Sequence, residues 1–598
     1  MLLSELFRSF VPLRNPIGFG ASDFVELVFA ALLVLPALAW RPWIEPHAAR
    51  LAQRAGWCML ALAALPVVLR LLLLPQHPLP LPQISDEFSH LLAADTLRHF
   101  RLANSTHPLH QFFETLDVLQ EPSYGSIYPI GQGAVLALGW MIFGHPWAGA
   151  MLSVAAFCAL CYWMLRGWTT PGWALAGGLL AVFEFGPLNE WMNGYWGGGV
   201  SAAAGCLVFG AMPRLLEGKP LESKLGERCL ARDALLLGLG LAVQWVVRPY
   251  EFILLAASAL LFFLPELRKV LEVRRKPANA RKPARVLAAV ALVMLPAASI
   301  TLIQNKQATG SWSTLPYMLS RHQYGVPTTF ATQPNPVPHR KLTPQQQLEY
   351  KMQVSFHGKT AETIPRFLER LEYRMRFYRF FFFAPLYLVL PAFLVALREW
   401  RFAWVALCLL IFALGANLYP FFFPHYIAAG TCLFVLVSVT GLERLYRLTI
   451  RGVPAGQEAA QLILLLCAAH FAFWYGLHLF DRQPFSMDLR QYETWDGLNH
   501  GDPVGRTAIQ RALAEVPGKQ LVFVHYWPQH IFQQEWVYNA ADIDGARVVW
   551  ARDLGAVENH KLLRYYPDRT AWLLEPDARP PKLGRYEPAP VTHSEGAP

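Results

Sequence analysis

Apolar runs about as long as a membrane is thick recur along most of this chain. A helix needs about twenty consecutive apolar residues to cross a bilayer. Runs near that length lie at 24–40, 56–75, 146–165, 172–187, 199–216, 232–248, 252–267, 285–304, 380–398, 402–418, 421–441 and 460–480. Of the 598 residues, 54% are hydrophobic and 16% are charged, and one water-soluble core could not bury so large an apolar fraction. The sequence therefore predicts an all-α polytopic membrane protein with about twelve transmembrane helices.

Lysine and arginine residues are concentrated in short loops between these runs, at 41–54, 267–285, 397–401 and 443–452. Positively charged loops stay on the cytoplasmic side of a membrane, so we interpret the net charge of +10 as topological rather than as a sign of nucleic-acid binding. Counting crossings from these loops predicts that the first twenty residues, the loops 76–145 and 305–379, and the C-terminal tail are extracytoplasmic. The short apolar stretch 131–144 is predicted to be juxtamembrane or re-entrant, because a full crossing there would reverse this assignment.

The tail changes character after residue 484. Helical patterns at 503–516, 529–540 and 557–565 alternate with β-rich runs at 521–526, 546–551 and 570–576. Such alternation is typical of a small α/β layer domain, which we predict for residues 485–580. No phosphate-binding glycine motif occurs in it. Residues 581–598, rich in proline and charge, are predicted to be disordered.

Two adjacent carboxylates, Asp86 and Glu87, lie just beyond the second apolar run. They open the amphipathic pattern "DEFSHLLAADTLRHF" after Ser85, as in the N-cap and first turn of a helix. An acidic pair at a membrane surface could serve as a general base, as a metal ligand or as a helix cap. Local sequence leaves all three uses open, and capping is compatible with catalysis.

The residues around this pair resemble a known family. An acidic pair in the first large extracytoplasmic loop, an amphipathic helix and then "EPSYGSIYPIGQG" (121–133) resemble the GT-C superfamily of integral membrane glycosyltransferases. Members include protein O-mannosyltransferases, aminoarabinose transferases of lipid A and RgtA/B/C/D-like transferases. The resemblance covers roughly residues 56–480. The stretches "NGYWGG", "RPYE" and "SRHQYGVPTTF" are similar to a largely uncharacterised bacterial branch.

This resemblance implies a GT-C-like fold for residues 1–484 and a sugar donor built on a polyprenyl phosphate. The sugar would be transferred with inversion to a glycan, lipid or protein acceptor at the outer face of a bacterial cytoplasmic (inner) membrane. The acid at the reacting centre would be Asp86, with Glu87 beside it. The chain departs from better-known relatives by an extra helix at 24–40 and by its α/β tail.

Cationic residues are needed where the phosphate leaving group develops charge. Arg248, Arg321 and His322 are the candidates on the predicted outer face, because guanidinium presents a planar fork to phosphate oxygens. A structural interpretation remains open for Arg248, which could snorkel or pair with Glu251.

Aromatic rings beside polar groups suit sugars, whose C–H faces stack on rings while their hydroxyls form hydrogen bonds. The predicted sugar- or acceptor-binding residues are Tyr128, Gln132, Glu190, Asn193, Tyr195, Trp196, Tyr250, Glu251, Tyr317 and Tyr324. An interfacial aromatic belt would explain the tyrosines and tryptophans equally well, but not the acids and amides among them.

No cofactor is predicted, although a divalent metal held by Asp86 or Glu87 together with Glu190 stays open. The main alternative function is a polytopic transporter or flippase of lipid-linked glycans, with a non-catalytic lipid-binding protein third. Transporters typically show repeated halves and polar sites near the bilayer midplane. Here the polar stretches cluster in the predicted outer loops and no internal repeat is evident.

Overall fold

The computed structural model describes residues 21–217, 224–272, 281–358, 362–480, 498, 502 and 504–587. The predicted extracytoplasmic start of the chain and residues 588–598 of the predicted disordered tail lie outside this range. The chain divides into two compact units. Unit 1 comprises Met1–Pro80, Phe143–Ile300 and Ala361–Asn499, and unit 2 comprises Leu81–Ile142, Thr301–Thr360 and His500–Pro598.

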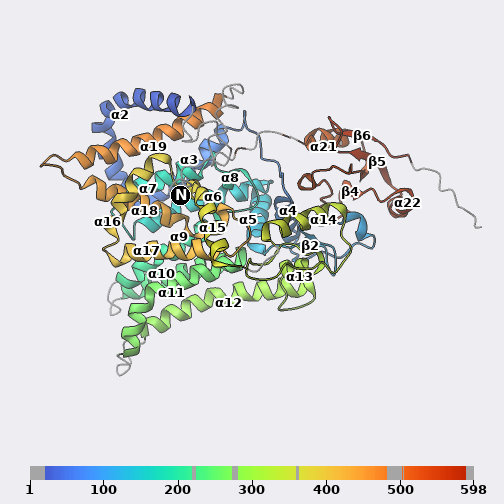
Figure 1. The fold of residues 1–598 in the computed structure, drawn as a ribbon, viewed down its shortest axis with the longest axis horizontal. Helices are drawn as coiled ribbons and strands as arrows, with labels where there is room; N and C mark the ends of the chain where they lie inside the picture. Colours follow the sequence, from blue (N-terminus) through green and yellow to red (C-terminus); the bar gives the residue numbers. More distant parts are fainter. Residues whose placement is uncertain are drawn as a thin grey trace, which may run out of the picture. The chain divides into compact units, whose positions relative to one another are not determined.

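Unit 1 is helical throughout its described part (Figure 1). Its α-helices are α2 (Ala21–Gln53), α3 (Ala55–Leu72), α6 (Trp147–Leu165), α7 (Pro171–Phe185), α8 (Glu190–Asn193), α9 (Gly199–Glu217), α10 (Lys224–Val247), α11 (Pro249–Glu272), most of α12 (Arg281–Thr309), α15 (Ile364–Arg374), α16 (Leu390–Ala396), α17 (Trp400–Ala416), α18 (Thr431–Tyr446) and α19 (Ala455–Phe480). Three 3-10 segments accompany them, η3 (Met375–Phe381), η4 (Ala384–Val389) and η5 (Pro424–Gly430).

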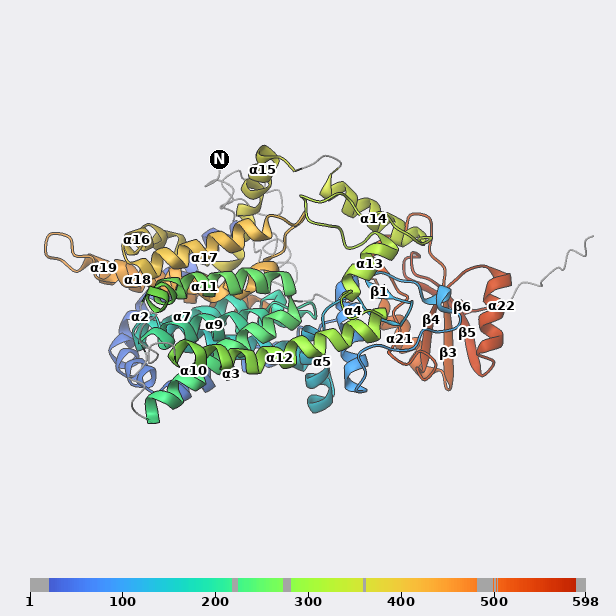
Figure 2. The same ribbon diagram turned by 90° about the horizontal axis from the view of Figure 1, so that it is seen from below.

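Small residues allow several of these helices to approach closely. A side chain at Gly205 in α9 would lie 1.8 Å from the Ala429 carbonyl oxygen, and one at Gly240 in α10 would lie 2.6 Å from that of Ala204. Helix association within a bilayer depends on such close packing, because lipid tails are as apolar as the helix faces. Helices α9, α10 and α11 accordingly lie side by side in both ribbon views (Figures 1 and 2).

The structure confirms a polytopic, mainly helical membrane protein. Within the described residues, 8 helices are long and apolar enough to cross a membrane, or up to 10 if each of two bent pairs is one span. The remaining two of the twelve predicted runs correspond to the shorter apolar helices Pro171–Phe185 and Trp400–Ala416. The stretch predicted to be juxtamembrane or re-entrant forms α5 (Ile130–Phe143), which is also shorter than a span.

One predicted crossing, 380–398, was wrong in detail. The segments Ile364–Phe381 and Ala384–Ala396 meet at a bend of 110° instead of forming one straight helix. Pro385 and Pro391 each lie at the first turn of a helical segment, η4 and α16. Proline is tolerated there but not inside a helix, so the apolar run is divided.

Unit 2 is assembled from three separate stretches of chain. Its first two stretches contribute α4 (Ser85–Arg98), η1 (His110–Phe113), the short hairpin β1 (Val118–Leu119) and β2 (Gly125–Ser126), α5, α13 (Pro316–Tyr324) and α14 (Pro344–His357). The third contributes α21 (Arg506–Glu515), β3 (Lys519–Val524), η7 (Phe532–Gln534), β4 (Val548–Arg552), α22 (Ala556–Tyr565), β5 (Arg569–Glu575) and β6 (Lys582–Arg585).

The C-terminal strands form one sheet in the order β4-β3-β5-β6 (Figure 2). The first three strands are parallel, and β6 is antiparallel to β5. Val522 of β3 lies opposite Trp550 of β4 on one side and opposite Trp572 of β5 on the other. Successive strand side chains point to opposite faces. Leu521 and Phe523 therefore join one apolar cluster with α22, while Val522 and Val524 join another with α21. The predicted α/β architecture of the C-terminal region is therefore confirmed.

Two local predictions in the tail were wrong. The helix predicted at 529–540 is absent except for η7, and the following Trp536 and Val537 are buried in the apolar cluster with Val522 and Val524 of β3. Residues 582–585, within the predicted disordered tail, form β6.

The apolar cluster beneath the sheet also includes residues from the first loop. Leu92 of α4, Phe112 and Phe113 of η1, and Tyr124 pack with Leu521 and Phe523 of β3. The C-terminal sheet and the loop that carries the acidic pair thus share one hydrophobic core. The predicted boundary after residue 484 remains a prediction.

Candidate functional site

The two adjacent carboxylates at the start of α4 make different contacts. Ile84 is the N-cap residue and provides no side-chain cap. The Oε2 atom of Glu87 accepts a hydrogen bond from the backbone N–H of Gln83 (2.8 Å), so Glu87 stabilises the entry into the helix. The Oδ1 atom of Asp86 instead accepts a hydrogen bond from the Tyr128 hydroxyl. Of the two acids, Glu87 therefore makes the capping contact. Asp86 instead contacts Tyr128, which belongs to the motif at 121–133.

Tyr128 is positioned by its neighbours on both sides. Its ring stacks on His90 of α4, with centroids 4.5 Å apart, and Gln304 donates a hydrogen bond to its carbonyl oxygen (3.2 Å). The following helix, α5, approaches α4 so closely that a side chain at Gly133 would lie 2.7 Å from the Ala93 Cβ atom. Gly133, the last residue of "YPIGQG", therefore allows Tyr128 to reach Asp86. Gln132, predicted to bind sugar, is buried in the same helix.

A second carboxyl, Asp117, lies next to Asp86. The structure places it immediately before β1 with a positive φ of 55°, a conformation that aspartate tolerates better than most residues. The Ser89 hydroxyl in α4 donates a hydrogen bond to the Asp117 carbonyl oxygen (2.6 Å) and lies 2.7 Å from the Ser126 hydroxyl in β2. Burial and then the charge of Asp86 raise the pKa of Asp117 to about 7, against an opposing hydrogen bond with the Ser85 side chain.

A third carboxyl comes from the long second loop. Glu349 in α14 is buried, and the Gln353 amide donates a hydrogen bond to its Oε1 atom (3.2 Å). Burial raises the pKa of Glu349 well above its usual value, and the charges of Asp117 and Asp86 act in the same direction. We call Asp86, Asp117 and Glu349 the carboxyl cluster. Neither Asp117 nor Glu349 was predicted from the sequence.

The second loop also brings two predicted residues toward Tyr128. Tyr317 in α13 lies 6.4 Å from the Tyr128 ring, and the Arg321 guanidinium lies 5.4 Å from the centre of the Tyr317 ring. Arg321 donates hydrogen bonds to the carbonyl oxygens of Pro327 (3.1 Å) and Thr328 (3.2 Å). Tyr128, Tyr317 and Arg321 thus form a continuous series of contacts leading away from Asp86.

Two further predictions in this loop make other contacts. His322 is exposed and stacks on His339 at 4.0 Å. The Tyr324 hydroxyl donates a hydrogen bond to Glu114 (3.1 Å), which also pairs with Arg340 (2.8 Å). These contacts stabilise the fold of the loop, and a role in binding phosphate or sugar remains a prediction for both residues.

The remaining predicted residues belong to unit 1. Arg248 lies between α10 and α11, where Pro249 begins the second helix. Its Nη1 atom lies 3.2 Å from Glu251 Oε1, and its guanidinium lies 5.1 Å from the centre of the Tyr426 ring. The Tyr250 hydroxyl donates a hydrogen bond to the Gly415 carbonyl oxygen (2.9 Å). The structure therefore contains the ion pair with Glu251 that the structural interpretation of Arg248 predicts. Phosphate binding by Arg248 remains a prediction.

The stretch "NEWMNGYWGGG" folds into a tight turn around α8, where Glu190 is the first helical residue. Asn193 accepts a hydrogen bond from buried Arg70 (2.6 Å), and Tyr195 donates one to the Pro80 carbonyl oxygen (2.7 Å). Trp196 lies 5.0 Å from His425. Gly198 has a φ of 114°, and a side chain there would lie 2.4 Å from the Trp191 ring, so the glycine is required by the turn. Sugar binding by these residues stays a prediction.

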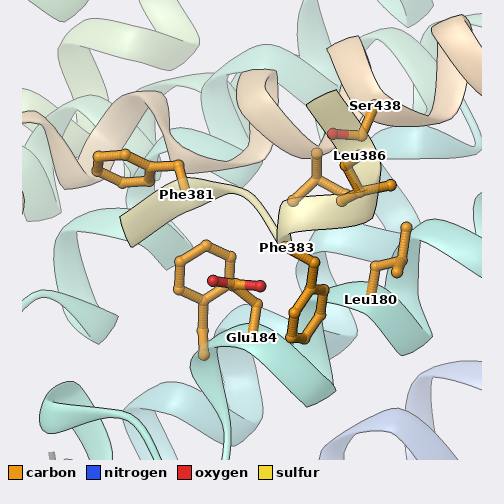
Figure 3. A pocket seen from close by; sticks show the side chains of 8 residues that line it. Leu180, Glu184, Phe381, Phe383, Leu386 and Ser438 are labelled. Atoms are coloured by element: carbon orange, nitrogen blue, oxygen red, sulfur yellow. The ribbon is translucent and has the colours of Figure 1, made fainter. Parts of the chain in front are cut away.

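A carboxyl is also buried within the helical bundle of unit 1. Glu184 in α7 points into a cavity lined by Leu180, Phe381, Phe383, Leu386 and Ser438 (Figure 3). The cavity volume is about 10 Å³, room for roughly one water molecule. It is too small for a sugar or a hydrated ion.

Metal binding has no compact ligand set in the part of the chain that the structure describes. No group of three or more histidine, cysteine, aspartate or glutamate side chains there has the geometry to hold a metal ion. Metal dependence through Asp86 or Glu87 with Glu190 gains no support from this arrangement.

Comparisons with known proteins give matches only among solved structures. No family model and no curated protein matches the chain. ArnT from Cupriavidus metallidurans bound to undecaprenyl phosphate is similar with a TM-score of 0.48 and 10% identity, over 87% of this chain and 93% of that chain. Its apo structure gives the same TM-score and identity over 88% and 93%. The Archaeoglobus fulgidus oligosaccharyltransferase is similar with a TM-score of 0.36 and 11% identity, over 79% of this chain and 62% of that chain. Because these TM-scores lie below 0.5, the proposal below rests on the residues of this chain.

Proposed function

We propose that this protein is a membrane glycosyltransferase that moves a sugar from a polyprenyl-phosphate donor to a cell-envelope acceptor. The observation that carries the proposal is the carboxyl cluster, in which Asp86 at the start of α4 accepts a hydrogen bond from Tyr128 beside two buried carboxyls with raised pKa values. The sequence resemblance around Asp86 and "EPSYGSIYPIGQG" gives the same reaction class. The polytopic helical unit supplies the membrane setting that a lipid-linked donor needs.

Asp86 acts as the general base in this proposal. The acceptor hydroxyl oxygen forms a bond to the anomeric carbon, and its proton passes to the Asp86 carboxylate. The bond between the anomeric carbon and the phosphate oxygen breaks, and its electron pair leaves with the polyprenyl phosphate. Attack from the face opposite the leaving group inverts the configuration.

Asp117 and Glu349 would keep the negative charge of the cluster on Asp86. Three carboxylates close together in a buried site repel one another, so the groups with raised pKa values retain their protons. A carboxyl that stays neutral can donate a hydrogen bond, which a carboxylate cannot. The cluster therefore pairs one base with a neutral Glu349 and a partly protonated Asp117 near neutral pH.

The donor phosphate would be bound by arginine, with Arg248 and Arg321 as the candidates. Arg248 carries a charge balanced by Glu251 and rests on an aromatic ring, an arrangement that holds its guanidinium in one orientation. The acceptor class, the outer face of the bacterial inner membrane and the inverting stereochemistry belong to this proposal as well. Transport, the alternative from sequence, gains no support from the cavity at Glu184, which holds about one water molecule.

The central experiment compares a deletion strain with the same strain carrying the parent or a variant gene. We expect deletion to remove one sugar from the envelope glycans and to accumulate its polyprenyl-linked donor, both measured by mass spectrometry. Asp86→Asn keeps the size and the acceptor oxygen for Tyr128, so the protein level should hold while transfer falls by roughly 10²- to 10⁴-fold. Full transfer by Asp86→Asn would remove Asp86 from the mechanism.

The same strains test the donor site. Arg248→Lys keeps the positive charge but loses the planar fork, so transfer should fall while the protein still folds. If Arg248→Lys and Arg248→Ala both matched the parent, Arg248 would serve only as the partner of Glu251.

A further inference from the structure

A residue of the C-terminal domain reaches the carboxyl cluster. The Tyr538 ring stacks on Phe88 in the first turn of α4, with centroids 4.1 Å apart and planes at 3°. The Arg506 guanidinium also lies close to the Phe88 ring, 4.7 Å from its centre. Nearby, the Ala541 N–H donates a hydrogen bond to Asp95 of α4 (2.7 Å). Tyr538 thus stacks on Phe88, which follows Asp86 by two positions in the chain.

The hydroxyl of Tyr538 is buried among polar groups. Burial raises the pKa of Tyr538 well above its usual value, and the charges of Glu535, Asp117 and Glu349 act in the same direction. Thr115 opposes that shift as a side-chain hydrogen-bond partner, but the contact between the two hydroxyls falls outside good hydrogen-bond geometry. The Thr115 hydroxyl and the Glu349 Oε2 atom are likewise buried without a hydrogen-bond partner among the described residues.

Three buried polar atoms without a well-formed hydrogen bond at one place call for a physical explanation. Each buried polar group left without a hydrogen bond costs about 1–3 kcal/mol, so native proteins rarely collect them. A ligand with several hydroxyls would satisfy all three, because a hydroxyl both donates and accepts. The donor and acceptor of glycosyl transfer are such ligands.

We infer that Tyr538, with Thr115 and Glu349, forms a subsite of the carboxyl cluster that binds the hydroxyls of the acceptor sugar or alcohol. This inference rests on the proposed function and extends it, because it places a group of the C-terminal domain at the reacting centre. The Tyr538 ring positions the first turn of α4 through Phe88. Its hydroxyl contacts the acceptor next to the base, Asp86.

The test uses the substitution Tyr538→Phe in the full-length chain, purified in detergent. Phenylalanine keeps the ring stacked on Phe88 and removes only the hydroxyl. Membranes from the deletion strain serve as the probe, because they contain both the donor and the unmodified acceptor. Sugar transfer is followed by mass spectrometry as the membrane concentration is raised, and the melting temperature is measured on the same samples.

We expect Tyr538→Phe to lower the ratio of maximal rate to half-saturating membrane concentration by about 3- to 10-fold, the effect of losing one hydrogen bond to substrate. The melting temperature should stay equal or rise, because a buried unpartnered hydroxyl has been removed. The matched control is Tyr373→Phe, the same change at an exposed tyrosine of α15, which should alter neither quantity.

Three outcomes decide the inference. Unchanged transfer by Tyr538→Phe together with loss of transfer by Asp86→Asn would overturn the subsite and leave the proposed function standing. A lower melting temperature with an equal loss of transfer would show that the hydroxyl stabilises the fold, and this also overturns the subsite. Full transfer by both variants would overturn the subsite and the proposed base together.

Discussion

Asp86 and Asp117 are chemically identical side chains that their surroundings make different. Asp86 is half-buried and accepts a hydrogen bond from Tyr128, whereas Asp117 is enclosed and carries a pKa raised to about 7. The difference arises from burial and from the charge of one acid acting on the other.

The raised pKa of Asp117 predicts how stability depends on pH. A carboxyl with a higher pKa in the folded than in the unfolded protein binds its proton on folding, so low pH favours the folded state. That advantage is lost as pH rises from about 4 to about 7 and changes no further above that range. We therefore expect the parent protein to melt several degrees lower at pH 8 than at pH 5, and Asp117→Asn to flatten this dependence.

Melting curves of the purified protein in detergent at both pH values measure the effect. Glu349 shifts in the same direction, so part of the slope should survive in Asp117→Asn and disappear in the double variant with Glu349→Gln. Asp568→Asn is the control, because that carboxyl is exposed. An unchanged slope in the double variant would show that the two buried acids do not titrate in this range.

At the scale of elements, the contact between α4 and α5 decides whether Tyr128 reaches Asp86. Gly133 leaves no room for a side chain against the Ala93 Cβ atom and backbone. We expect Gly133→Val to force the helices apart, to destabilise the protein by about 1–3 kcal/mol and to reduce transfer by at least tenfold, because the hydrogen bond from Tyr128 would lengthen.

The control for this packing prediction is Gly172→Val in α7, where nothing lies within 4 Å of the added group. Melting temperature and sugar transfer are measured on both variants. Equal melting temperatures for the two valine variants would mean that α5 can shift without cost, and the close approach would then not explain the glycine.

At the scale of the whole molecule, the discontinuous unit 2 constrains the membrane topology. Its three stretches belong to one compact unit, so they must lie on the same side of the membrane. Even numbers of crossings must then separate them. The apolar helices α6, α7, α9, α10, α11 and α12 separate the first two stretches, and the bent pair 364–396 with α17, α18 and α19 separates the last two. Both sets are even if the bent pair crosses once.

Cysteine labelling tests this topology. Seven of the native cysteines are buried, so replacing Cys229 by serine should leave little background labelling of native cysteines. A cysteine at exposed Asp568 should react with a membrane-impermeant maleimide in intact spheroplasts, because the distribution of positive loops predicts that unit 2 is extracytoplasmic. A cysteine at Arg285 should react only after lysis. The reverse pattern would place Asp86 in the cytoplasm and contradict the proposed reaction.

Much of the architecture follows from local patterns in the sequence. The lengths of the apolar runs predict the membrane helices because a helix must satisfy its own backbone within lipid. The alternation in 521–524 predicts strand β3 because side chains of a strand point to opposite faces. The helix at 85–98 was predicted because helical periodicity is local, whereas Asp86 was singled out by the resemblance of its surroundings to a known family.

The carboxyl cluster and its subsite were decided by the tertiary structure. Asp117, Glu349 and Tyr538 come from three separate stretches of unit 2, and no spacing in the sequence relates them to Asp86. Their raised pKa values depend on burial, which arises when the stretches pack on one core. Local patterns record which residues favour a helix, a strand or the membrane. Contacts between distant stretches set the burial and the charge at a site. Such contacts produce no periodic pattern in the sequence.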